Sequence, residues 1–332
     1  MEIFELGDFP LSTGVTLPNA KLAYDTYGSL SATKDNAIVL TNFMGGQPEA
    51  LEVWIGNDRP LNPDKYFIIL PGMFGGGFSS SPSNTPPPFD RGAFPPVNIS
   101  DDVIAQQRLV TERFGIQDLQ LVVGWSVGAA QCYEWAIRFP HMVKRMASFS
   151  GAPKISSWTQ LWNRTVVEEP IMSDPAWNNG FYPDRQAVQA GARRQALGAA
   201  LTAPPRHFFR EELWRAGGFI SLEDFLSRFW EAFWLTTDPN DVLSQARKAR
   251  AADPSEGGDL AAALGKIKAK TFVVGFTGDN LFPPEECKSF ADQIPNAEFR
   301  EISTAFGHMA TLGFTEQDRQ AIDNVLREVL AD

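Results

Sequence analysis

The chain has 332 residues, of which 43% are hydrophobic, and its formal net charge is −11. This length and composition suit a folded protein with a sizeable core and exclude a disordered one. The acidic balance argues against nucleic acid or an anionic membrane as the main partner, because both reward clustered Lys and Arg. No stretch approaches the ~20 apolar residues of a membrane span, and the N-terminus lacks a secretory pattern. Cys132 and Cys287 match no zinc spacing. We therefore expect a cytoplasmic protein with free thiols and with neither a metal nor a cofactor.

Strand signals alternate with helical segments along the chain. A half-exposed strand is predicted at 20–28, and short apolar strands are predicted at 37–43, 66–72, 119–125, 146–151 and 271–278, with a last one at 298–303. Apolar runs of this kind suit a parallel sheet that is buried on both faces. A helix is predicted over 100–115, with Ser100 as its cap and Gly115 at its end. Another helix follows Ser126 and stops at Pro140. The alternation predicts an α/β fold with a mostly parallel sheet and helices on both faces.

The stretch from 155 to 265 has a different character. Strand signals vanish there, and it holds six of the nine tryptophans, namely Trp158, Trp162, Trp177, Trp214, Trp230 and Trp234. We predict a helical lid over 155–265 inserted into a core of residues 1–154 and 266–332. The alternative is an ordinary helical layer that packs its own core. The two interpretations are compatible, because a helical lid can cover an active site and also have a core of its own. Residues 71–99 are rich in Gly, Pro and Ser, and their composition fits either a flexible loop or a long ordered one.

The segment G-W-S-V-G at 124–128 fits G-x-S-x-G, the pattern of a nucleophile on a tight strand-to-helix turn. Gly124 and Gly128 would remove side chains that clash in such a turn. The pattern alone arises by chance, but an apolar strand precedes it and a helix-forming segment follows it. The sequence therefore favours Ser126 as a nucleophile over an inert serine in a turn.

A nucleophilic serine needs a general base and a carboxylate that orients the base. The chain has three histidines. His141 ends the helix after the turn and His207 lies in the lid, whereas His308 follows the last strand at a loop, where a base belongs. Asp279 follows the strand at 271–278 and precedes His308, although a solvated aspartate in a turn would look the same. The order Ser126, Asp279, His308 is that of nucleophile, acid and base in α/β hydrolases.

These residues resemble the homoserine O-acetyltransferase family of the α/β-hydrolase fold. The likeness covers nearly the whole chain and is carried by residues 98–143 around the serine, GDNLFPPEE at 278–286, STAFGH at 303–308 and SDPAWNNGFY at 173–182. It implies a ping-pong reaction in which the serine takes an acyl group and passes it on. It also implies an oxyanion hole formed by the backbone N–H groups of Met44 and Val127, and a homodimer with contacts through the lid.

The chain departs from this family where homoserine would bind. Met309 stands where the family has an aspartate for the amino group, and Ala232 and Thr236 align with basic residues for the carboxylate. A desolvated charge without a partner is costly, so the pocket is predicted to be apolar, with Trp125, Phe233, Trp234, Thr236 and Met309 in it. Arg228 is left open as a displaced cation.

Three hypotheses about function follow from these observations. The first is a serine carboxylesterase that hydrolyses small uncharged short-chain acyl esters, such as alkyl acetates, through an acyl-enzyme. The second is an O-acetyltransferase that uses acetyl-CoA. The third is a binding module without catalysis, which is disfavoured because such modules generally lose part of the triad. The departures at Met309 and Thr236 favour the esterase.

Overall fold

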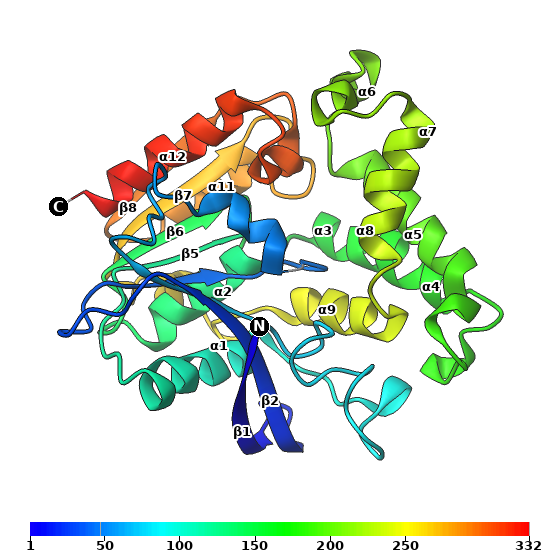
Figure 1. The fold of residues 1–332 in the computed structure, drawn as a ribbon, viewed down its shortest axis with the longest axis horizontal. Coiled ribbons are helices and arrows are strands. Elements are labelled where there is room, and N and C mark those ends of the chain that lie inside the picture. The colour runs from blue at the N-terminus through cyan, green and yellow to red at the C-terminus, as the bar shows by residue number, and fades with distance from the viewer. Residues whose placement is uncertain (47, 332) are drawn as a thin grey trace.

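The computed structural model describes residues 1–46 and 48–331, whose strands form one eight-stranded sheet (Figure 1). Their order in space is β1-β2-β4-β3-β5-β6-β7-β8. The β1–β2 and β2–β4 pairs are antiparallel and all other pairs are parallel, so the predicted, mostly parallel sheet is confirmed. The strands are β1 Glu2–Pro10, β2 Thr16–Tyr27, β3 Ala37–Thr41, β4 Phe67–Pro71, β5 Leu121–Trp125, β6 Arg145–Phe149, β7 Lys270–Phe276 and β8 Ala297–Ile302.

The sequence did not predict β1. This strand lies at the edge of the sheet, and only Leu6 and Phe9 of its nine residues are buried. Gly7 has a φ of +68°, and the register with β2 shifts on either side of it. These bulges break the alternation of apolar and polar residues that signals a strand.

Helices cover both faces of the sheet, with α1 and α2 on one face and α12 on the other (Figure 1). The core helices are α1 Ile99–Arg108, α2 Val127–Arg138, α11 Pro284–Ala291 and α12 Glu316–Leu330. The prediction that Ser100 caps α1 is wrong, because Asn98 is the cap and its N–H donates to the Asp101 carboxylate at 2.8 Å. Gly115, with a φ of +66°, ends the helical run as predicted.

The described residues between β6 and β7 contain helices and no strand. These helices are α3 Ser157–Trp162, α4 Glu169–Met172, α5 Gln189–Thr202, α6 Arg206–Arg210, α7 Leu222–Phe225, α8 Ala232–Trp234, α9 Pro239–Ala251 and α10 Leu260–Leu264. Most of them stand beside the sheet, at the right of Figure 1. Of the tryptophans in this stretch, Trp158 is 50% exposed and the others are buried. The lid boundaries at 155 and 265 stay a prediction.

The segment 71–99 is an ordered loop tied to both the sheet and the lid. The hydroxyls of Ser79 and Ser80 accept hydrogen bonds from the strand β2 amides of Ala23 and Lys21 at 3.1 and 2.9 Å. The Asp241 carboxylate of α9 accepts from the N–H and the hydroxyl of Ser83 at 3.1 and 2.6 Å. Burial raises the pKa of Asp241 to about 7. Side-chain bonds, which composition does not reveal, therefore decide between the two alternatives left open by the sequence.

An ion pair with no solvent exposure joins the lid to the core. The Lys248 ammonium of α9 donates to the Asp102 carboxylate of α1 at 2.6 Å and to the Phe74 carbonyl at 2.7 Å. The same carboxylate accepts from the Phe74 N–H at 2.8 Å. Because both charges are buried, each depends on the other for its stability.

Replacing one partner of this pair should strongly destabilise the protein. We expect Lys248→Met to lower the free energy of unfolding in urea by roughly 3–5 kcal/mol, because a buried carboxylate is left alone. Lys288→Met is the control, since Lys288 and Asp292 are 54% and 61% exposed and such pairs contribute at most about 1 kcal/mol. Equal losses in the two variants would contradict this account.

Candidate active site

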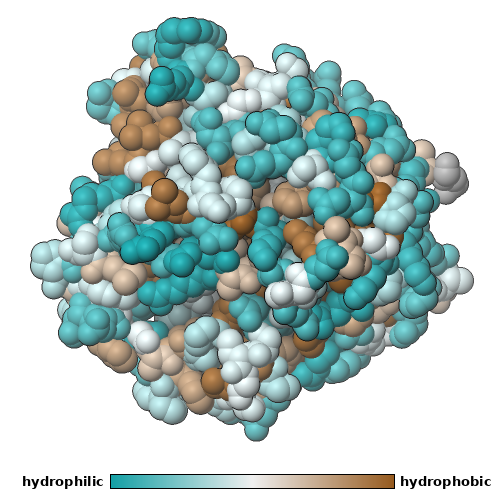
Figure 2. Space-filling view, turned by 180° about the vertical axis from the view of Figure 1, so that it is seen from behind, coloured by the Kyte–Doolittle hydropathy of each residue, from teal (hydrophilic) through white to brown (hydrophobic). Residues whose placement is uncertain are grey.

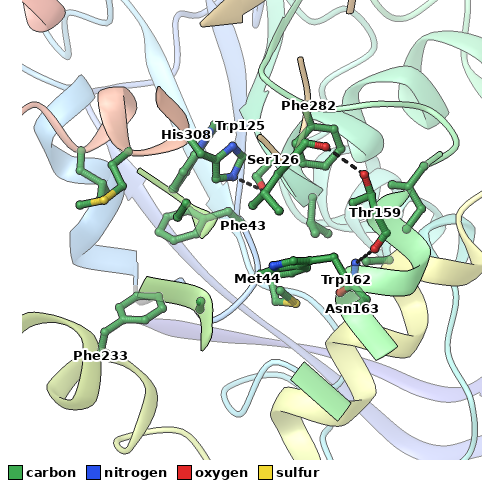
Figure 3. Close-up of a pocket in the computed structure, with 18 of the residues that line it drawn as sticks. Phe43, Met44, Trp125, Ser126, Thr159, Trp162, Asn163, Phe233, Phe282 and His308 are labelled. Atoms are coloured by element: carbon green, nitrogen blue, oxygen red, sulfur yellow. Dashed lines mark hydrogen bonds between the residues drawn. The ribbon is translucent and has the colours of Figure 1, made fainter. Parts of the chain in front are cut away.

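Ser126 occupies a strained turn between β5 and α2. Its φ and ψ are 58° and −122°, a region that residues with a side chain rarely adopt. The Ser126 N–H donates to the Phe149 carbonyl of the neighbouring strand β6 at 3.0 Å, which helps to hold the turn. The side chain reaches the cavity shown in Figure 3. The geometry is that of the nucleophile turn predicted from G-x-S-x-G.

The glycines of the motif are required by close backbone contacts. A Cβ atom at Gly124 would lie 2.0 Å from the Thr41 hydroxyl, and one at Gly128 would lie 2.7 Å from the Thr41 carbonyl oxygen. Gly151 after β6 is a third such position, because its Cβ would lie 2.4 Å from the Ser126 carbonyl oxygen. The first two were predicted from the motif, whereas Gly151 lies far along the chain and gives no local signal.

The structure brings Ser126, His308 and Asp279 together from three separate segments. His308 belongs to the 3₁₀ helix Gly307–Leu312, and its Nε2 lies 3.0 Å from the Ser126 Oγ. Its Nδ1 lies 2.7 Å from the Asp279 Oδ2. The imidazole is held between the rings of Trp125 and Phe282, with centroids 4.9 and 5.5 Å away. The hydrogen bonds therefore run from hydroxyl to imidazole to carboxylate in the order that general-base catalysis needs.

The Asp279 carboxylate is buried and accepts several hydrogen bonds. Its Oδ1 accepts from the N–H groups of Leu281 and Phe282 at 2.7 and 3.0 Å, and its Oδ2 accepts from the Ser150 hydroxyl. Ser150, which follows β6 directly and has a φ of +44°, was not predicted from the sequence. A serine at the end of a strand beside the nucleophile strand was the available signal.

The other two histidines lie outside this network. His141 is exposed, and His207 is half-buried in α6. Neither has a hydrogen bond to Ser126 or Asp279 in the part of the chain that the structure describes. Both cysteines are free, and burial raises the pKa of the Cys132 thiol to about 12 and that of the Cys287 thiol further. Neither thiol is therefore available as a thiolate nucleophile.

Val127 and Met44, whose backbone amides are the predicted oxyanion donors, both lie beside the cavity. Val127 is the first residue of α2, where helix N–H groups have no partner within the helix. Met44 lies in the turn after β3, and both residues line the cavity. Neither amide has a hydrogen-bond partner among residues 1–46 and 48–331, so both can donate to a ligand.

The cavity beside Ser126 is small and predominantly aromatic. Its volume is about 200 Å³, and its aromatic walls are Phe43, Trp125, Trp162, Phe229, Trp230, Phe233, Trp234 and Phe282. Figure 3 shows Phe43, Trp125 and His308 around the serine, and Thr159, Trp162 and Asn163 across from it. Among the described residues that line it, His308 is the titratable one, and none is Asp, Glu, Lys or Arg. The cavity thus suits an uncharged ligand.

Four of the predicted pocket residues line this cavity, namely Trp125, Phe233, Trp234 and Met309. Thr236 does not: it is exposed, and its hydroxyl donates to the Phe233 carbonyl at 2.8 Å. The helix α8 ends at Trp234, so the chain turns away before Thr236. Ala232 is exposed as well. Arg228 offers no displaced cation, because its side chain is 68% exposed and pairs with Asp224 at 3.4 Å.

Four polar atoms in the cavity wall have no hydrogen-bond partner within the described residues. They are the indole Nε1 atoms of Trp125, Trp230 and Trp234 and the carboxamide Oδ1 of Asn163. A buried polar atom without a partner costs free energy. These atoms are buried within the wall, so the surface that the cavity presents to a ligand is predominantly apolar.

The described residues offer neither a metal site nor a membrane-spanning helix. No group of three or more His, Cys, Asp or Glu side chains is arranged to hold a metal ion within 1–46 and 48–331. None of the helices in this part of the chain has both the length and the apolar character needed to cross a bilayer.

Comparison with known proteins gives a consistent result. Residues 43–313 match the family model described as the alpha/beta hydrolase fold. The ethyl acetate hydrolase of Pseudomonas veronii is 40% identical over 99% of this chain and 95% of that protein. The solved structure of the acetyl esterase MekB, also 40% identical, superposes with a TM-score of 0.97 over 100% of this chain and 96% of that one. The homoserine O-acetyltransferase of Methanobrevibacter ruminantium is 30% identical over 97% of this chain and 72% of its own length.

Proposed function

Because the chain belongs to the α/β-hydrolase fold family, we propose that it is a serine carboxylesterase that hydrolyses small uncharged short-chain acyl esters. The resemblance to homoserine O-acetyltransferases is confirmed, with esterases as the more similar relatives. One observation supports the proposal above all others: the hydrogen-bonded series Ser126, His308 and Asp279 opens onto a small cavity without charged walls.

The reaction begins with attack of the Ser126 Oγ on the ester carbonyl carbon. His308 Nε2, 3.0 Å from this oxygen, takes the hydroxyl proton, and Asp279 holds the imidazole in the required tautomer. The N–H groups of Met44 and Val127 donate to the oxyanion of the tetrahedral intermediate. The C–O bond to the alcohol then breaks, and the alcohol leaves with the proton from His308. Water, deprotonated by His308, then attacks the acyl carbon; the bond to Ser126 Oγ breaks, His308 returns the proton to this oxygen, and the carboxylic acid leaves.

The size and chemistry of the cavity support acetate esters of small alcohols as substrates. The most similar relatives given above are an ethyl acetate hydrolase and an acetyl esterase. A volume of about 200 Å³ favours short acyl and alcohol groups. The aromatic walls would bind the alkyl parts of the substrate.

Acetyl transfer from acetyl-CoA to homoserine is the second candidate, favoured by the relatives with that name. Homoserine carries an ammonium and a carboxylate, and each needs an opposite charge in a closed site. The described cavity wall has neither, since Met309 stands in it and Thr236 and Arg228 lie outside it. This charge requirement places the transferase below the esterase.

The proposal includes a cytoplasmic homodimer with small-molecule esters as substrates and without a cofactor. An apolar face of the lid supports the dimer. Trp158 and Leu161 of α3 and Leu201 of α5 are 50%, 59% and 73% exposed, and α3 and α5 are in contact through the Trp162–Thr202 hydrogen bond at 2.7 Å. Apolar residues also gather on the lid side of the molecule in Figure 2. Exposed faces of this kind are typical of contacts between subunits.

The catalytic assignment predicts a specific pattern of variants. Ser126→Ala should take no label from a serine-directed phosphonate, whereas the unmodified protein takes one. His308→Ala should lower turnover by several orders of magnitude with the fold intact, because the serine loses its base. His141→Ala and His207→Ala are the matched controls and should keep most of the activity. A phosphonate on another serine, or a His207→Ala variant as inactive as His308→Ala, would contradict the assignment.

The esterase branch predicts how the acyl-enzyme divides between acceptors. With an alkyl acetate, water and homoserine present together, acetate should form and O-acetylhomoserine should be negligible. Each missing charged hydrogen bond costs roughly 1.5–3 kcal/mol, so two of them weaken homoserine binding by roughly two to four orders of magnitude. The measurement is chromatographic quantification of both products. O-acetylhomoserine formed faster than acetate would return the transferase to first place.

The dimer contact predicts a change of mass in solution. Leu201→Arg places a charge on the exposed face of α5 and should shift the molecular mass in sedimentation from two chains to one. Ile220→Arg is the control, because Ile220 is 77% exposed but lies outside α3 and α5. A single-chain mass for the unmodified protein would reject the dimer.

A further inference from the structure

The loop after β3, residues 42–46, forms hydrogen bonds with two buried glutamines, one from the core and one from the lid. Gln131 lies on α2 and Gln245 lies on α9, and they are 0% and 1% exposed. The loop carries Met44, whose N–H is an oxyanion donor in the function proposed above. Hydrogen bonds on both sides of the loop therefore constrain Met44, whereas the other proposed oxyanion donor, Val127, is held by its helix.

The peptide groups on either side of the Met44 amide are held by hydrogen bonds. The Asn42 carbonyl accepts from Gln131 Nε2 at 2.8 Å, and the N–H of the same peptide group, that of Phe43, donates to the Asn42 side chain at 2.8 Å. On the other side, the Gly45 N–H donates to Gln245 Oε1 at 2.9 Å. These bonds fix the planes of the peptide groups before and after the one that contains the Met44 N–H.

The peptide group of Met44 is also held at its carbonyl end. The Phe43 carbonyl accepts from the Gly46 N–H at 3.0 Å, and the Asn42 side chain donates to the Gly46 carbonyl at 2.9 Å. Above the loop, a Cβ at Gly45 would lie 3.0 Å from the Phe233 ring. The loop is thus held by hydrogen bonds between its own residues and packs against Phe233 of the lid. The Met44 N–H remains free to donate to a ligand.

The orientation of the Gln131 carboxamide is set by a second glutamine. Gln106 Nε2 donates to Gln131 Oε1 at 2.6 Å, and Trp135 Nε1 donates to Gln106 Oε1 at 2.9 Å. Because an indole nitrogen is a donor alone, this series assigns Gln106 Oε1 as acceptor and Gln131 Nε2 as the donor to the loop. In this buried network each side chain donates a hydrogen bond to the next, from Trp135 to Gln106 to Gln131, and Gln131 donates to the Asn42 carbonyl.

We propose that Gln131 and Gln245 are positioning residues that aim the Met44 N–H at the oxyanion. The inference rests on the proposed acyl-transfer function. An oxyanion donor acts only where charge develops in the transition state, so a small rotation of its peptide group affects turnover rather than substrate binding. Gln245 extends this role to the lid, because α9 supplies the hydrogen bond that fixes the loop from above.

The test uses two substitutions, each of which removes the hydrogen bond from one glutamine to the loop. Gln131→Met keeps the approximate volume but loses the donor to the Asn42 carbonyl, together with the acceptor for Gln106. Gln245→Met keeps the approximate volume but loses the acceptor for the Gly45 N–H. Both should lower kcat for an alkyl acetate by roughly 10- to 100-fold, with KM within about twofold. Gln245→Glu retains an acceptor in either protonation state and should recover most of kcat.

A trifluoromethyl ketone separates positioning from a structural role. It forms a tetrahedral adduct with the serine, so its Kd should rise in both variants by the factor lost in kcat. Gln195→Met is the matched control, since Gln195 is a buried glutamine of α5 and is not among the hydrogen-bond partners of the loop described above, and it should leave kcat and Kd unchanged. Unfolding in urea checks that all variants are folded.

Two results would overturn the inference: unchanged kcat in both variants, or a lower kcat without a weaker ketone complex. The ketone Kd is measured by calorimetry and needs no substrate. If the unmodified protein hydrolyses no acetate ester, the proposed function fails, and the ketone series still decides the role of the glutamines.

Discussion

The backbone of Ser126 is the constraint on which the rest of the site depends. A φ of 58° at a residue with a side chain is unfavourable, and the surrounding structure must hold it. The carbonyl of Phe149 holds it from the neighbouring strand, and close contacts with Thr41 and with the Ser126 carbonyl leave no room for side chains at Gly124, Gly128 and Gly151. In return, the turn exposes the serine hydroxyl and starts α2 immediately behind it, so that the first helix amide lies beside the nucleophile.

Much of the fold and the three principal residues could be predicted from the sequence because their signals are local. Apolar strands are short and contiguous: Ser126 follows one directly and Asp279 comes soon after another, while His308 lies in the loop after the last strand. Ser150, Gln131 and Gln245 could not be found in this way. Their residue types are common, and their partners lie far away, as with the 200 residues between Gly45 and Gln245. Thr236 was wrongly predicted to line the pocket, because the alignment with the family gave no sign that α8 ends at Trp234.

The cavity explains how one arrangement of residues can serve two reactions in related proteins. The acyl half of the reaction needs the serine, the base and the oxyanion donors, and nothing in it depends on the acceptor. The acceptor half depends on the charges of the wall. Phe, Trp and Met side chains surround Ser126, and the described lining residues include no carboxylate or guanidinium. A zwitterionic acceptor therefore finds no charged partner in the wall and does not compete with water for the acyl group.

The buried contact between Lys248 and Asp102 has a consequence for how such lids can change during evolution or in the laboratory. A lid taken from a relative without a lysine at this position would leave the Asp102 carboxyl buried in the core without its partner. The two positions must therefore be exchanged together, although 146 residues separate them in the chain. Recombination that divides the gene between α1 and α9 would be selected against, and chimeric enzymes should be built with both residues from the same parent.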